Sequence, residues 1–149
     1  MLTAALLLVT GHSAAWAQSD RAYVLYRQHI MQALGANLNA ISDIFRFRLP
    51  YNADIRVHAA SLAGNAAMVR ASFEKQVVNP QSTVKAELWT HWAEFVRLSD
   101  ELQSASAALA AAAAAGDANQ IGIQVKAVGA TCKACHDRFR AQEEPRRRR

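Results

Sequence analysis

The sequence predicts an all-α protein, built as an antiparallel four-helix bundle. Apolar residues recur at three- and four-residue spacing in four successive segments, which is the period of an amphipathic helix. Hydrophobic residues make up 52% of the 149-residue chain, and only 6 glycines and 3 prolines interrupt it. No segment shows the strict alternation of a half-buried strand. Four such helices with short connections pack most simply as an antiparallel bundle around one core.

The first two expected helices lie on either side of Pro50. The first follows Asp20, which we expect as its N-cap, and ends at Pro50. Its predicted core stripe is Met31, Leu34, Leu38, Ile41 and Phe45. The second begins near Asn52 and ends before Asn79-Pro80, and its stripe contains small residues that let helices approach closely: Ile55, Ala59, Leu62, Ala66, Val69 and Phe73.

The last two expected helices are joined at Gly116. Ser82 or Thr83 is the expected cap of the third, which carries the stripe Leu88, Trp92, Phe95 and Leu102 and continues through the alanine-rich residues 107–115. Gly116 is its expected end. Asp117 then caps the fourth helix, whose buried stripe is Ile121, Val125, Val128, Cys132, Cys135 and Phe139.

The ends of the chain differ in composition from the expected bundle. Residues 1–17 contain an apolar run followed by the small-x-small triplet Ala15-Trp16-Ala17, and we expect them to be a signal peptide, with a short buried helix as the alternative. Residues 18–141 then form the four-helix domain. Residues 142–149 form a basic tail, which we expect to be solvated rather than to bind an acidic partner. No other Lys/Arg cluster with interleaved aromatics indicates binding to nucleic acid.

The motif that carries the chemistry is Cys132-Lys133-Ala134-Cys135-His136. C-x-x-C-H is the attachment signature of c-type haem, and these are the only two cysteines in the chain. A redox dithiol would be expected in a βαβ unit, and no strand pattern precedes the motif. A structural zinc site would need a second pair of Cys or His ligands. We therefore expect one covalently attached haem c and, since its attachment is extracytoplasmic, a location in the periplasm.

The sequence resembles the class II cytochromes c, the cytochrome c prime family, from about Ala22 to Arg140. The resemblance rests on Tyr26-Arg27-Gln28 and Met31, Pro50-Tyr51, Glu87-Leu88-Trp89, and residues 128–137 around the cysteines. It implies a four-helix bundle with haem near the C-terminus. It also implies a possible homodimer through the first two helices.

The resemblance assigns roles to six residues. Cys132 and Cys135 would form thioethers, and His136 would be the proximal iron ligand. Arg140 would lie near the proximal imidazole and Arg27 near the haem propionates, an exposed helical arginine being the alternative for each. Met31 would face the distal side. There it would either bind the iron, as in the low-spin Met/His members, or shield a five-coordinate iron.

Two functions follow from the two possible roles of Met31. Electron transfer to a periplasmic redox partner requires an iron ligated by His136 and Met31, and we favour this function because the thioether is present. The alternative is capture of nitric oxide or carbon monoxide by a five-coordinate iron. We expect no enzyme activity, because no acid–base constellation accompanies the motif. His29, His58 and His91 stand off the main stripes and are expected to be exposed.

Overall fold

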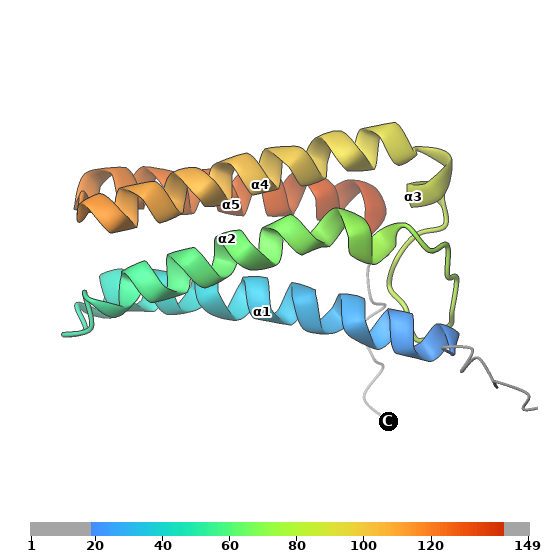
Figure 1. Ribbon diagram of the computed structural model, residues 1–149, viewed down its shortest axis with the longest axis horizontal. Helices are drawn as coiled ribbons and strands as arrows, with labels where there is room; N and C mark the ends of the chain where they lie inside the picture. The colour runs from blue at the N-terminus through green and yellow to red at the C-terminus, as the bar shows by residue number, and fades with distance from the viewer. Residues whose placement is uncertain (1–18, 142–149) are drawn as a thin grey trace, which may run out of the picture.

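The structure is a computed structural model that describes residues 19–141. It confirms the four-helix bundle (Figure 1). Four long helices make up the bundle, with one short helix before the third of them: α1 (Asp20–Phe47), α2 (Asp54–Phe73), α3 (Glu87–Thr90), α4 (Trp92–Ala115) and α5 (Ala118–Phe139). The expected signal peptide, residues 1–17, and the whole of the expected basic tail, residues 142–149, lie outside the described residues. Among the described helices, none is long and apolar enough to cross a bilayer.

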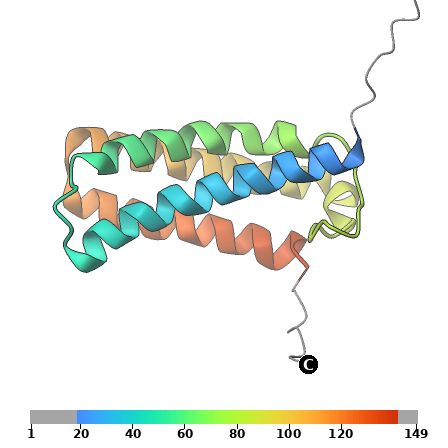
Figure 2. The ribbon, with the colours of Figure 1, turned by 90° about the horizontal axis from the view of Figure 1, so that it is seen from below.

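The four long helices form a ring in which one pair makes few contacts. Helix α1 packs along α2, α2 along α4, and α4 along α5, whereas α1 and α5 barely touch. Both views of the ribbon show α1 and α5 diverging toward the end of the bundle where α5 stops (Figures 1 and 2). The sequence places the two cysteines and His136 in the last two turns of α5, at this end.

The core of α1 is displaced from the predicted stripe. Phe45 was expected to be buried, but it is 38% exposed, and Ile44 takes its place at 5% exposed. The reason is that α1 carries two adjacent apolar stripes. One is fully buried and includes Ile30, Leu34 and Ile41, and the other contains the half-buried Met31 and Leu38, which pack against the core from its edge. All six residues of the predicted α2 stripe are buried.

Local capping signals predicted the start of α5 and the end of α4 correctly. The Asp117 side chain accepts a hydrogen bond from the Gln120 amide at 3.0 Å, and Gly116 adopts the left-handed conformation with φ 70°. The prediction for α1 was wrong by one residue. Ser19 is the N-cap, and Asp20 lies in the first turn, where its carboxylate pairs with Lys75 at 3.4 Å.

The predicted start of the third long helix was also wrong. Neither Ser82 nor Thr83 caps a helix; instead, the Ser82 hydroxyl accepts a hydrogen bond from the Val84 amide at 3.2 Å. Helical structure begins at Glu87, pauses at His91 and resumes at Trp92. Residues 83–85 are extended because their main chain pairs with the end of α5, a contact distant in sequence.

Candidate haem-binding site

The three residues of the attachment motif lie together on α5. Cys132 and Cys135 are half-buried free thiols that pack against the hydrophobic core, and His136 follows at the surface. A separation of three residues in a helix places both thiols on one side of it. Two thiols on one helix side with an imidazole next to them fit covalent haem, whose two vinyl groups require two such thiols.

The electrostatics of these groups agree with attachment better than with thiol redox chemistry. Burial raises the pKa of Cys132, and burial together with the charge of Cys132 raises the pKa of Cys135 to about 11. A redox dithiol instead needs a thiol whose pKa is lowered. Partial burial, and next the positive charge of Arg140, lower the pKa of His136 despite the opposing effect of Asp137. The lowered pKa favours the neutral imidazole, which is the form that binds a metal.

Arg140 is close enough to His136 to influence its imidazole through charge. It is the exposed C-cap of α5, in extended conformation, and its amide donates to the His136 carbonyl at 2.9 Å. Its side chain acts on the imidazole through its charge. Cys132, Cys135, His136 and Arg140 thus form one group at the end of a single helix.

Met31 lies on α1. It is half-buried and packs against the same core as Cys132 and Cys135. Trp89 and Trp92 also pack against this core, and Trp92 stacks on Phe95 with the ring centroids 5.2 Å apart. Both indoles therefore take part in core packing.

Arg27 is buried rather than exposed on its helix. It is 2% exposed, and its guanidinium donates to three main-chain carbonyls in the last turn of α2 and the segment after it: Ser72 at 2.7 Å, Val77 at 3.4 Å, and Lys75. It also lies over the rings of Phe73 and Trp89, 5.0 and 5.4 Å from their centroids. Burial lowers the pKa of Arg27. The sequence could have indicated this burial, because Arg27 lies on the buried stripe of α1 between Val24 and Ile30.

Aromatic contacts connect Arg27 to the end of α5. The Phe73 ring beneath Arg27 lies 5.0 Å from Phe95, and Phe95 in turn meets the edge of Phe139 at 6.0 Å, measured between centroids. Phe139 is the last residue of α5 and is 3% exposed. The three rings come from α2, α4 and α5 and form one cluster at the end of the bundle that holds the motif.

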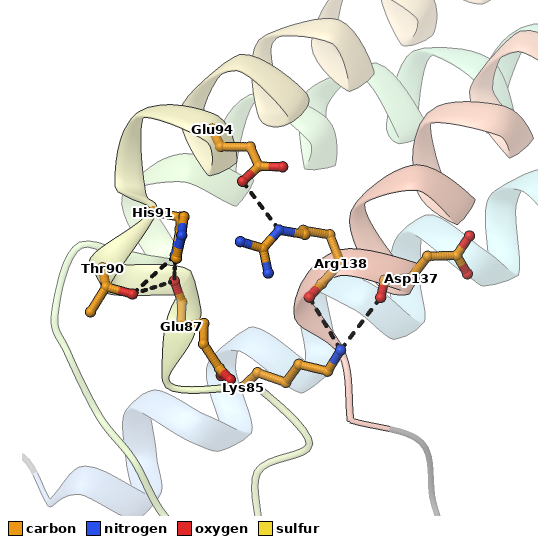
Figure 3. Close-up of polar contacts among 7 residues, drawn as sticks. All are labelled: Lys85, Glu87, Thr90, His91, Glu94, Asp137 and Arg138. Atoms are coloured by element: carbon orange, nitrogen blue, oxygen red, sulfur yellow. Dashed lines mark hydrogen bonds and ion pairs between the residues drawn. The ribbon is translucent and has the colours of Figure 1, made fainter.

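The sequence did not predict the contacts of the other polar residues around the end of α5. Lys85 bonds to carbonyls of α5, and Arg138 of α5 pairs with Glu94 of α4 at 3.2 Å (Figure 3). Of the three other histidines in the described residues, His29 and His91 are exposed as expected. His58 is not: it is half-buried, and its Nδ1 lies 2.9 Å from the Asn37 amide oxygen.

The sequence profile of the family described as Cytochrome C′ matches residues 22–140. The chain belongs to the cytochrome c′ family. It is 37% identical over 123 residues to cytochrome c′ of Pararhodospirillum photometricum, covering 82% of this chain and 98% of that protein. It is 33% identical over 142 residues to cytochrome c′ of Rhodospirillum rubrum, covering 95% and 97%. Proteins of this family bind haem c.

Solved cytochromes c′ have the same fold. A nitric oxide complex of a variant from Alcaligenes xylosoxidans has a TM-score of 0.77 at 27% identity and covers 84% of this chain and 98% of its own. A carbon monoxide complex of another variant from that organism has a TM-score of 0.76 at 27% identity and covers 83% and 98%. Cytochrome c prime from Shewanella frigidimarina superposes with a TM-score of 0.78 at 23% identity over 84% and 98%, a likeness of fold.

Proposed function

We propose that this protein holds one haem c and binds a diatomic gas, nitric oxide or carbon monoxide, at its iron. The observation that carries the proposal is the likeness, over more than four-fifths of the chain, to cytochromes c′ solved with these two ligands. When bound, haem supplies an iron that accepts such a ligand and changes oxidation state. Gas binding therefore replaces electron transfer as the function best supported.

Each residue of the site would have a separate role in this function. Cys132 and Cys135 anchor the porphyrin to α5. His136 would hold the iron through its imidazole, whose pKa is lowered by partial burial and by the charge of Arg140. Met31, half-buried on α1, would exclude water from the iron and limit the size of the ligand that reaches it. No acid–base residue is needed, because the proposed protein binds its ligand without transforming it.

Electron transfer remains the second candidate because of one observation, the thioether of Met31. Methionine is a soft ligand that raises the haem potential when it binds iron opposite histidine. A methionine that binds the iron would close the site to gas, whereas a methionine that only packs beside it would leave the site open. The two functions thus differ in whether the Met31 sulfur binds the iron.

The absorption spectrum of the ferric protein and a pair of variants test whether the Met31 sulfur binds the iron. If Met31 only shields, the wild-type iron is high-spin, Met31→Ala leaves the spin state unchanged, and carbon monoxide binds the reduced variant faster. Met68→Ala is the control, because Met68 is 40% exposed on α2, and it should leave the spectrum and the binding rate unchanged. Low-spin wild-type iron that becomes high-spin in Met31→Ala would contradict gas binding and support electron transfer.

Haem attachment is tested separately. The holoprotein should keep its haem in acid–acetone and have the mass of the chain plus one haem, because both thiols are joined to the porphyrin. Haem that passes into the organic phase would contradict the thioether roles of Cys132 and Cys135.

We propose that the protein works in the periplasm, where haem c is attached. The apolar run and Ala15-Trp16-Ala17 support export and cleavage before Gln18. Sequencing the N-terminus of protein from a periplasmic fraction should give Gln18 as the first residue. A mature chain that retains Leu2 would contradict this cleavage.

We also propose a homodimer through α1 and α2. Apolar side chains are exposed on both helices, with Leu25 at 39% and Tyr26 at 52% on α1, and Val57 at 60% and Met68 at 40% on α2. Val57→Glu should convert a dimer to a monomer in sedimentation velocity. Ile123→Glu, on α5 and 54% exposed, is the matched control and should leave the dimer intact. A wild-type monomer would contradict the proposal.

A further inference from the structure

The segment before α3 lies along the end of α5. The Lys85 amide donates to the Phe139 carbonyl at 2.9 Å, and the Ala141 amide donates to the Thr83 carbonyl at 2.7 Å. Between these two bonds, Val84 and Arg140 face each other in an antiparallel bridge. The main chain beyond His136 is therefore held by residues more than fifty positions away in sequence.

The side chain of Lys85 reaches the same helix end. Its ammonium donates to the carbonyl oxygens of Asp137 at 3.4 Å and Arg138 at 3.3 Å (Figure 3). The last carbonyls of a helix have no partner within it, and a cation placed there is favourable because the helix dipole is negative at that end. With its own amide on Phe139, Lys85 provides partners for all three carbonyls that follow His136 in α5.

The end of α5 is held from its other side as well. Arg138 pairs with Glu94 of α4, and the buried Phe139 ring packs against Phe95. These contacts fix α5 against α4. They do not involve the three carbonyls after His136, which bind to Lys85. The His136 carbonyl itself accepts a hydrogen bond from the Arg140 amide.

We infer that Lys85 is a positioning residue for His136. It holds the helical turn that presents the imidazole, and it places a positive charge beside that turn. Without it, the last turn of α5 would fray, and the imidazole would be held in a wider range of orientations. Loss of the charge would also favour the oxidised iron, because a nearby cation stabilises the state with fewer positive charges. The inference rests on the proposed iron ligand His136, but it does not depend on gas binding.

The test compares Lys85→Met and Lys85→Arg with a matched control in the holoprotein. The control is Lys126→Met, which makes the same change at an exposed position earlier on α5. Amide hydrogen exchange measures the helix end whatever the function of the protein. In Lys85→Met we expect the Arg140 and Ala141 amides to exchange at least about tenfold faster, because charge-assisted bonds at the helix end are lost.

Two measurements on the iron separate a positioning role from a merely structural one. In Lys85→Met the iron–histidine stretching band of the ferrous protein should broaden or shift, and the midpoint potential should fall. Lys85→Arg should restore both, and Lys126→Met should leave both at wild-type values. If Lys85→Met does not fold, Lys85→Gln replaces it with the same expectations.

Either of two results would overturn the inference. One is faster amide exchange with an unchanged iron–histidine band and potential, and the other is an equal fall in potential in Lys126→Met. Failure of the proposed function appears elsewhere, as low-spin wild-type iron that does not bind carbon monoxide.

Discussion

Replacing Arg27 with methionine should destabilise the bundle strongly. Methionine keeps much of the side-chain length and the packing on Phe73 and Trp89, but it removes every donor. The carbonyls of Ser72 and Val77 belong to buried residues, 6% and 2% exposed, so water cannot easily replace the lost bonds. The substitution therefore tests the hydrogen bonds rather than the volume of the side chain.

The size of the effect follows from the three bonds. A hydrogen bond to a charged group contributes about 1.5–3 kcal/mol. The Ser72 bond is short and buried and should contribute this full amount. The long Val77 bond and the bond to the exposed Lys75 should each contribute about half of it. The expected loss is about 4 kcal/mol of unfolding free energy. For a domain of this size that corresponds to a fall in Tm of about 15 °C.

Urea unfolding of the holoprotein, followed by far-UV circular dichroism, measures the loss directly. Arg27→Lys is the control: it keeps the charge but lacks the planar group that reaches three carbonyls, and it should lose about half as much. A loss below about 1 kcal/mol in Arg27→Met would refute the assignment of Arg27 as the residue that holds the end of α2.

Three further substitutions test single contacts by the same unfolding assay. Asp117→Ala removes the side-chain cap of α5 and should cost about 1 kcal/mol; an unchanged stability would mean that water replaces the cap. Ser106→Ala removes a buried hydroxyl that has no hydrogen-bond partner in the structure, so stability should stay equal or rise by up to about 1 kcal/mol, and a clear loss would reveal a partner. Trp89→Phe removes the bond from the indole nitrogen to the Phe73 carbonyl, 2.8 Å long, and should cost about 1–2 kcal/mol; a stability equal to that of the wild type would contradict a role for that bond.

Features that depend on neighbouring residues were predictable from the sequence. The period of the apolar residues predicted the four long helices, and Gly116 and Asp117 predicted the turn between α4 and α5, because capping acts within a few residues. The attachment motif was visible for the same reason, since its three functional residues lie in two turns of one helix.

Features that depend on contacts between distant residues were missed. Ser82 has the composition of a helix cap, but residues 83–85 pair with the end of α5, and this contact displaced the start of the helix. From the sequence alone, Lys85 cannot be distinguished from an ordinary surface lysine, because its carbonyl partners are more than fifty residues away. Phe45 was misplaced because two adjacent apolar stripes on α1 satisfy the same period, and only packing selects between them.

The contacts of Arg27 join α1 to the segment after α2, and they restrict amino-acid substitution differently in the two. Its guanidinium bonds to main-chain oxygens, which any residue type supplies, so Lys75 and its neighbours can exchange side chains without loss of these bonds. The arginine has no such freedom, because no other side chain offers five donors in one plane. A library of single substitutions should therefore tolerate changes at residue 75 broadly and at residue 27 hardly at all. The loop after α2 is free to acquire new surface properties while its path stays fixed.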